Sequence, residues 1–308
     1  MKKIAVFFAT VSAFSLFAQD PLFFNTNQSL VYLNPSFAGS NGGIRNQLSY
    51  RDQWPKLSGD YVTLTNTFDA YIKPLKAGIA VTYLVDDVAH GTLKSSGLSI
   101  AYAQHLSFGE GKLKIIPSVQ FGYGMKSLDR DNLHFGSTID PRNNIIWNNP
   151  SILPSVTKNY FNMSGGLLVN FKRDLYVGAY VFNFNQPDIG MAGVSKLPYR
   201  VLFHASYNYH ITEQINLQAF YRFNRQQAAN FNQLSLNALF KNRFIAGFGL
   251  ASNYTPFVNL GYRYYFITVQ GGYDISKAST GAASWEFHIS LNFGNKEQFK
   301  ANSNFENW

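Results

Sequence analysis

Apolar and polar residues alternate one by one along many segments of this chain, and no other feature constrains the fold as strongly. Trp285–Phe293 has an apolar residue at every odd position and a polar or charged residue at every even one. Val201–Ile211, Ile215–Phe223 and Leu234–Phe240 follow the same period. Because side chains at i and i+2 share one face of a strand, each segment is predicted to form a strand with an apolar and a polar face. The chain is therefore predicted to be all-β.

The pattern predicts about 14 strands, an even number such as bacterial outer-membrane barrels have. The expected strands are 43–50, 61–72, 75–85, 93–107, 112–128, 159–171, 174–184, 198–211, 214–225, 230–240, 243–252, 255–265, 267–274 and 283–293. Many of them exceed the roughly 5–6 residues of a typical soluble strand and are long enough to cross a bilayer when tilted.

The connections between these strands alternate in length. Short connections at 73–74, 109–111, 172–173 and 212–213 take turns with longer ones at 51–60, 86–92, 129–158 and 185–197. Short periplasmic turns and longer outer loops are typical of a transmembrane antiparallel outer-membrane β-barrel. Both termini are then expected on the periplasmic side. A soluble β-sandwich or lectin-like protein is the alternative fold.

The first residues predict export. Met1-Lys2-Lys3 is positive, Ile4–Phe17 is apolar and Ala18 follows, which is the form of a secretory signal peptide too short to span a membrane. We expect four parts: a signal peptide over 1–18, an N-terminal periplasmic or plug segment over 19–42, a transmembrane β-barrel over 43–294 and a periplasmic tail over 295–308. Residues 19–42 are rich in large apolar side chains, so they are expected to pack into the mouth or lumen of the barrel, or to dock a partner.

Composition excludes several classes of function. Charged residues make up only 14% of the chain and aromatic residues 17%, with a net charge of +9. Lys and Arg form no run longer than a pair, which argues against a nucleic-acid partner. The chain has no cysteine, so disulfides, thiolate metal sites and cysteine nucleophiles are excluded.

No catalytic or cofactor motif is present. The sequence lacks H-E-x-x-H, G-x-S-x-G, the P-loop and G-x-G-x-x-G, so no catalytic residue, cofactor or metal ligand is predicted. A barrel enzyme that uses His204, His210 or His288 with Glu286 stays open as a minor hypothesis. Aspartates at 86–87 and 129–131 indicate either a calcium site or solvated turns.

Basic residues outnumber acidic ones on the polar faces of the strands and in the short turns. The basic residues expected in the lumen are Arg45, Lys114, Lys126, Arg200, Arg222 and Arg263, against Asp69 and Glu286. An enclosed positive surface attracts acidic or C-terminal carboxylate ligands. The alternative is that these charges only hydrate a pore, and that the cations of the short turns meet lipid headgroups.

Two motifs carry a family resemblance. The residues concerned are Asn34, Pro35, Phe37, Ala38 and Gly39 in Asn-Pro-Ser-Phe-Ala-Gly, and Arg51, Gln53, Trp54 and Pro55 in Arg-Asp-Gln-Trp-Pro. Together with blocks at 84–87, 97–106 and 135–142, they resemble the PorP/SprF family of Bacteroidota outer-membrane proteins. We interpret the motif residues as partner-binding or structural positions. Trp54 can either anchor a protein partner or sit in the aromatic girdle of the barrel.

The resemblance implies a role in the type IX secretion system. It implies an outer-membrane component that binds or anchors secreted cargo, such as adhesins with a type B C-terminal domain, or couples to the periplasmic ring proteins, often in gliding motility. The implied partners are outer-membrane lipids, the cargo C-terminal domain and the ring proteins. The alternative function is a passive outer-membrane channel or porin for small solutes.

Overall fold

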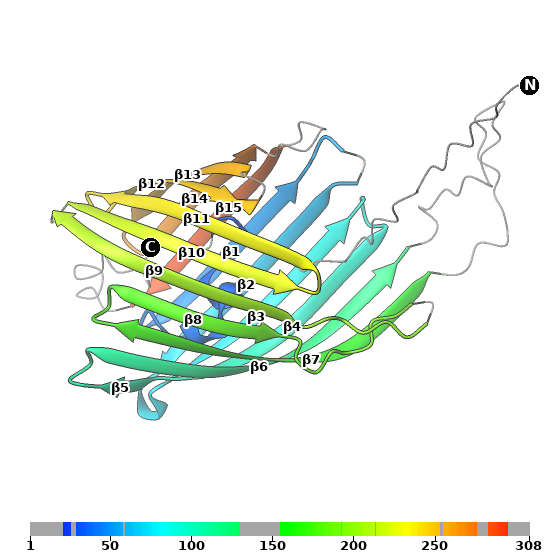
Figure 1. Ribbon diagram of the computed structural model, residues 1–308, viewed down its shortest axis with the longest axis horizontal. Helices are drawn as coiled ribbons and strands as arrows, with labels where there is room; N and C mark the ends of the chain where they lie inside the picture. Colours follow the sequence, from blue (N-terminus) through cyan, green and yellow to red (C-terminus); the bar gives the residue numbers. More distant parts are fainter. Residues whose placement is uncertain are drawn as a thin grey trace, which may run out of the picture.

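The computed structural model describes residues 21–25, 29–57, 59–129, 155–191, 193–212, 214–252, 255–275 and 283–294. They form one antiparallel sheet that closes into a barrel around an N-terminal segment (Figure 1). The strands are β1 Ile44–Gln53, β2 Tyr61–Ile72, β3 Ala77–Val88, β4 Leu93–Gln104, β5 Leu106–Phe108, β6 Leu113–Leu128, β7 Val156–Phe171, β8 Leu175–Phe182, β9 Arg200–Thr212, β10 Ile215–Gln226, β11 Ala229–Phe240, β12 Phe244–Ala251, β13 Thr255–Tyr264, β14 Ile267–Ile275 and β15 Ala283–Phe293.

Two pairings close the ring. β1 pairs with β15 along its whole length, and β4 pairs with β6. β4 and β5 both pair with β6 and so act as one barrel strand, interrupted at Gln104 and His105. Pro117 of β6 lies opposite this interruption and has no N–H to give to the ladder. The predicted closed antiparallel barrel of 14 strands is therefore confirmed.

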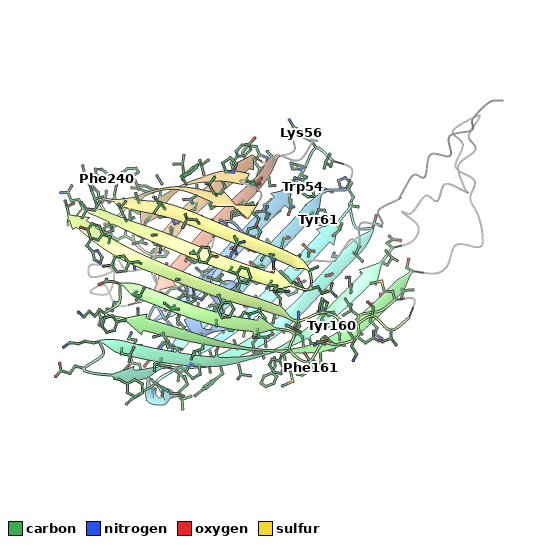
Figure 2. The ribbon with its side chains drawn as sticks, viewed as in Figure 1. Trp54, Lys56, Tyr61, Tyr160, Phe161 and Phe240 are labelled. Carbon is green, nitrogen blue, oxygen red and sulfur yellow. The ribbon has the colours of Figure 1, made fainter. Side chains whose placement is uncertain are left out.

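The two faces of each strand are as different as the alternation predicts. On β9, Phe203, Tyr207 and Tyr209 are exposed on the outer surface, whereas His204 and Asn208 are buried in the lumen. Tyr160 and Phe161, neighbours on β7, project to opposite sides of the sheet (Figure 2). Exposed large apolar side chains surround the barrel, which is the surface that a lipid bilayer covers.

The barrel has two different ends. At the turn end, strands are joined by the 3-10 helix η3 Lys73–Leu75 and by tight turns such as 172–174 and 241–243. At the loop end, the connections include 54–60 and 183–199. The alternation of lengths does not persist through the second half of the barrel, because residues 227–228 alone join β10 to β11 at the loop end.

One strand boundary matters for the site. β1 continues to Gln53, so Arg51 lies in the strand, opposite Glu286 of β15 and Thr63 of β2. The expectation that the first loop begins at residue 51 is therefore wrong. The alternation explains why the strand is longer. Arg51 continues the row of inward-facing residues that begins with Arg45, and its side chain is buried in the lumen, so the strand pairing continues to Gln53.

A short N-terminal segment fills the lumen. It contains the helix α1 Leu30–Leu33 and the 3-10 helix η2 Pro35–Phe37, which are drawn in blue inside the barrel in Figure 1. In the part of the chain that the structure describes, no helix is both long and apolar enough to cross a membrane. The segment packs its apolar side chains against inward-facing residues of several strands. Its members in this internal core are Leu30, Val31, Leu33, Phe37 and Ala38.

The segment runs from one end of the barrel to the other. It leaves β1 at the turn end, and residues 21–25 lie near the loop end, beside residues close to the loop-end limits of β1, β11, β13 and β15. The expectation that the N-terminal end of the chain lies on the periplasmic side, together with the short turns, does not hold for residues 21–25, which contact strand residues near the loop end. The tail 295–308 lies outside the described residues.

Candidate functional site in the barrel lumen

The Asn-Pro-Ser-Phe-Ala-Gly motif lies inside the barrel, toward the turn end. We call residues 34–39, with Arg45 and Asp69 of the wall, the turn-end anchor. Asn34, Ser36 and Phe37 are fully buried there. Asn34 precedes η2, and its side-chain Oδ1 accepts the N–H of Ser36 at 3.0 Å, which caps the short helix. Pro35 follows at the first helical position, where its missing N–H costs nothing.

The side chain of Asn34 also binds the barrel wall. Its Nδ2 donates to the carbonyl oxygens of Leu167 at 3.3 Å and Ala179 at 3.4 Å, and lies 3.2 Å from His204 Nε2. Two glycines of the wall make room for these contacts. A Cβ at Gly166 would lie 2.6 Å from Asn34 Oδ1, and one at Gly178 would overlap the His204 ring. The wall is therefore shaped to receive this asparagine.

Phe37 and Ala38 fit the next part of the wall. The Phe37 ring lies 5.5 Å from the His204 ring and 6.2 Å from the Tyr176 ring, measured between centroids. The carbonyl oxygen of Ala38 lies 2.9 Å from His105 Nε2, at the interruption between β4 and β5. Since the backbone of Ala38 touches Gly78 of β3, only a residue without a side chain fits at position 78.

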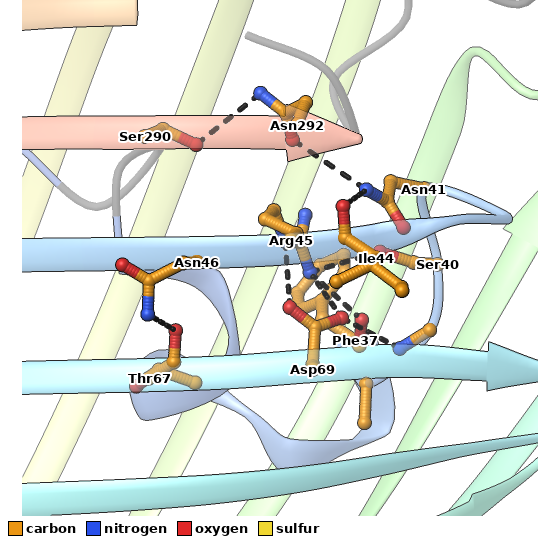
Figure 3. Close-up of polar contacts among 12 residues, drawn as sticks. Phe37, Ser40, Asn41, Ile44, Arg45, Asn46, Thr67, Asp69, Ser290 and Asn292 are labelled. Carbon is orange, nitrogen blue, oxygen red and sulfur yellow. Dashed lines mark hydrogen bonds and ion pairs between the residues drawn. The ribbon is translucent and has the colours of Figure 1, made fainter. Parts of the chain in front are cut away.

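An ion pair completes the turn-end anchor (Figure 3). Arg45 and Asp69 face each other on β1 and β2, and Arg45 Nε and Nη2 donate to the two carboxylate oxygens at 2.9 and 3.1 Å. Arg45 Nη2 also donates to the Phe37 carbonyl at 3.1 Å, and Gly39 N–H donates to Asp69 at 2.7 Å. Gly39 has a positive φ of 68°, which glycine adopts without strain. The charges of the wall thus hold the backbone of the motif.

A second set of contacts holds residues 21–25 near the loop end. We call these residues the loop-end strap. The carboxylate of Glu286 accepts the N–H groups of Phe24 at 2.6 Å and Asn25 at 2.8 Å. Arg222 donates to the Phe23 carbonyl at 3.0 Å, and Gln233 donates to the Phe24 carbonyl at 2.7 Å. Four main-chain groups of the strap are therefore bound by side chains of the barrel.

The ring of Phe24 lies in an aromatic pocket. It stacks on Phe257 with centroids 5.1 Å apart and lies 6.2 Å from Phe231. The Arg51 guanidinium carbon lies 4.2 Å from the centre of the Phe24 ring, a cation–π distance. Arg51 is itself held by Glu286 and by Asp274, the latter at 3.1 Å. The arginine of the second motif therefore contacts the strap.

The rest of the second motif lies elsewhere. Gln53 ends β1, and Trp54 and Pro55 begin the first loop. The Trp54 ring packs edge-on against Tyr61 with centroids 5.9 Å apart, and Pro55 is exposed (Figure 2). The structure therefore divides the predicted site: residues 34–39 and Arg51 make contacts within the lumen, whereas Trp54 and Pro55 lie at the rim of the loop end.

The basic lumen residues do not form one positive surface. Arg45 and Arg51 are paired with acidic groups, and Arg222 binds the strap. Arg200 is buried with its guanidinium carbon 3.6 Å from the centre of the Phe182 ring. Lys126 and Arg263 are half-buried, near the loop end of β6 and the turn end of β13 respectively.

Sequence reasoning missed one acidic partner, Asp274. The alternating pattern indicates its position, because Asp274 continues the row of inward-facing residues formed by Thr268 and Gln270 on β14. The three candidate histidines do not meet either. His204 contacts the turn-end anchor, His288 contacts Phe23 and Glu286, and His210 lies at the turn end beside Asp174.

A cavity of about 100 Å³ remains between the N-terminal segment and the wall. It lies beside Val31 and Tyr32 and is bounded by residues of β3, β4, β6 and β7 near the loop end. Among the described residues, no group of three or more His, Cys, Asp or Glu side chains could hold a metal ion. Elsewhere in the lumen, Leu30, Val31, Leu33, Phe37 and Ala38 of the N-terminal segment pack against inward-facing wall residues.

The connection between β8 and β9, at the loop end, is organised by Asp188. Its carboxylate accepts from Lys158 Nζ at 2.8 Å and from the N–H groups of Ser195 at 2.8 Å and Gly190 at 3.0 Å. The hydrogen bond from Lys158, with those from the two backbone groups, holds the pKa of Asp188 well below its ordinary value.

Comparisons with known proteins agree with this architecture. A family model described as "Type IX secretion system membrane protein PorP/SprF" matches residues 15–293. No curated protein matches the chain at a significant level. Among solved structures, the Ralstonia pickettii toluene transporter TbuX is similar with a TM-score of 0.55 and 11% identity, covering 87% of this chain and 94% of that chain.

A second solved structure is similar to the chain as well. The monoaromatic hydrocarbon channel CymD has a TM-score of 0.51 and 14% identity, covering 89% of this chain and 94% of that chain. At such low identity these likenesses show the fold alone. They show a closed antiparallel β-barrel, and together with the family match they place the chain in the outer membrane.

Proposed function

Because the chain belongs to the PorP/SprF family of type IX secretion system membrane proteins, we propose that it binds secreted cargo at the outer face of the outer membrane and holds it there. The chain is an outer-membrane component of that secretion system. The proposed cargo is a secreted protein, such as an adhesin with a type B C-terminal domain. Coupling to the periplasmic ring, and a part in gliding motility, extend the same proposal.

The observation that carries the proposal is the family match over 15–293, which covers the barrel and the segment inside it together. The N-terminal segment inside the lumen also supports it, since a barrel that contains part of its own chain leaves less room for passive flow. That argument disfavours the alternative of a porin for small solutes. The separation of the histidines likewise supports a non-enzymatic role.

The two motifs support different parts of this function. Residues 34–39 are buried against the wall, so we assign them to holding the N-terminal segment. Trp54 and Pro55 lie at the loop end, where secreted cargo arrives, and we assign them to partner contact. At the turn end, exposed basic residues are available for the periplasmic ring or for lipid headgroups. They are Lys73, Lys76, Lys112, Lys172, Arg173, Lys241 and Arg243.

The test is purification of the tagged protein from its native outer membrane in mild detergent, followed by identification of what co-purifies. A stoichiometric secreted protein held by its C-terminal domain is the expected result, and periplasmic ring proteins would support coupling. Trp54→Ala should reduce the retained cargo, whereas Lys56→Ala in the same loop should not. A barrel that purifies alone and conducts ions in a planar bilayer would overturn the proposal in favour of a channel.

A further inference from the structure

The strap is bound in the way that a receptor binds a separate peptide. Its main-chain hydrogen bonds to the barrel come from β10, β11 and β15, while within the N-terminal segment the Tyr32 hydroxyl donates to the Pro21 carbonyl at 2.7 Å. Glu286 accepts two successive N–H groups, while Arg222 and Gln233 donate to two successive carbonyls. This arrangement of acceptors and donors is complementary to a polypeptide main chain.

The side chain of Phe24 lies in an aromatic pocket of the wall. Phe24 is enclosed by Phe231, Phe257 and the guanidinium of Arg51, which together accept a flat aromatic ring. Asn25 adds a hydrogen bond from its Nδ2 to Gln270. The subsite therefore combines main-chain recognition with a pocket for one aromatic residue.

The wall of this subsite has hydrogen-bonding capacity that the strap does not use. Within the described part of the chain, Gln270 Nε2, Arg222 Nε and His288 Nδ1 are buried and have no hydrogen-bond partner. Gln270 and Arg222 are at least nine-tenths buried. Their free atoms are donors, so they suit a ligand that offers more carbonyl oxygens than the strap does.

We propose that the lumen around Phe24 is a binding site for an extended polypeptide with an aromatic residue, and that residues 21–25 occupy it in cis. A second polypeptide of this kind competes with the strap for the site. The site lies toward the loop end, so that polypeptide comes from the outer side. This goes beyond the proposed function, because it concerns a displaceable contact inside the lumen and does not require the competitor to be cargo.

The test uses the purified mature barrel and a fluorescein-labelled peptide with the sequence of residues 19–29. In one variant, residues 21–25 are replaced by Gly-Ser-Gly-Ser-Gly, which keeps the length and empties the subsite. Fluorescence anisotropy should show one peptide bound per variant barrel, with at least about tenfold weaker binding to the unaltered barrel. The strap occupies the unaltered site at a high effective concentration, which explains the difference.

Two controls make the outcome decisive. A peptide carrying Phe24→Ala should bind at least about tenfold more weakly, and Glu286→Gln in the Gly/Ser variant should reduce binding of the unaltered peptide. If the Gly/Ser variant does not fold, the single substitution Phe24→Ala in the full chain serves instead and should increase peptide binding. Equal binding of both peptides, or no binding to any folded variant, would overturn the proposal. Neither result would bear on the cargo recovered by co-purification.

Discussion

The carbonyl oxygen of Ala38 occupies the space that a side chain at Gly78 would need, so the N-terminal segment and β3 touch backbone to backbone. The contact lies at the base of the turn-end anchor. The N-terminal segment is therefore packed closely against the barrel wall. The wall contributes glycines at positions 78, 166 and 178 for this purpose.

Gly78→Ala should therefore loosen the turn-end anchor. The added Cβ overlaps backbone, which cannot move aside cheaply, and overpacking of this kind costs about 1–3 kcal/mol. The temperature at which the barrel loses its heat-modifiable migration on a gel should fall. Gly271→Ala is the matched control, because its nearest neighbour would be 4.0 Å away, and it should behave as the unaltered protein. Equal shifts for both variants would show that the contact is unimportant.

Breaking the Arg45–Asp69 pair should destabilise the protein strongly. Both side chains are buried, at 1% and 0% exposure, and removal of one partner leaves an uncompensated charge that costs about 3–5 kcal/mol. Arg45→Ala or Asp69→Asn should lower the free energy of unfolding by urea by that amount. The double substitution Arg45→Met with Asp69→Leu should recover much of the loss, since it removes both charges. A double variant as unstable as the sum of the singles would argue against the pair.

The direction of the N-terminal segment predicts where a tag becomes accessible. An epitope inserted directly before Pro21 should be labelled by antibody on intact cells, because residues 21–25 lie toward the loop end. A tag at the C-terminus should need permeabilised cells, since β15 ends beside the start of β1 at the turn end. If the tag before Pro21 were labelled only after permeabilisation, residues 21–25 would not lie toward the outer side of the membrane.

The lowered pKa of Asp188 makes the outer loop sensitive to acid in a defined direction. The carboxyl group of Asp188 has a lower pKa in the folded loop than its ordinary value of about 4, so its ionisation stabilises the folded loop at any pH above about 4. This stabilisation is lost as the pH falls from about 4 through the lowered pKa. Cleavage of the loop by pepsin should stay slow down to about pH 4 and accelerate below it. Asp188→Asn should be cut readily throughout this range, whereas Asp129→Asn, in another loop, should not. A flat profile for the unaltered protein would refute the role of Asp188.

Most of the barrel could be predicted from the sequence, because one-residue alternation specifies both the strand and its two environments. His204 and Phe203 show this: their polarity alone indicates lumen and lipid. The limits of β1 could not be predicted as well. Arg51 precedes an evident turn at Trp54-Pro55, and only its partners Glu286 and Asp274, far away in sequence, show that the strand continues.

The site was harder to predict than the fold. The motif at 34–39 could be recognised from its residue types. Its packing, however, depends on Gly78, Gly166 and Gly178, which are far away in the sequence and which no local pattern marks as contacts. The positive lumen was predicted from a sum of charges, whereas in the structure Arg45 is paired with Asp69, Arg222 binds a carbonyl and Arg200 lies over an aromatic ring. Asp274 could have been counted from its place in the alternating row. The position of residues 21–25 near the loop end could not be predicted, because an irregular segment has no periodic pattern of apolar residues to interpret.

The contacts of the strap also bear on how the molecule is assembled. Phe24 and Glu286 are 262 positions apart, and the strap meets the first strand and the last strand at once. Contacts this distant in sequence form late, since the intervening chain must be ordered before they are gained. Residues 21–25 precede every strand in the sequence and are thus among the last described residues to reach their final position. A seated strap therefore requires that the first and the last strand of the barrel have already met.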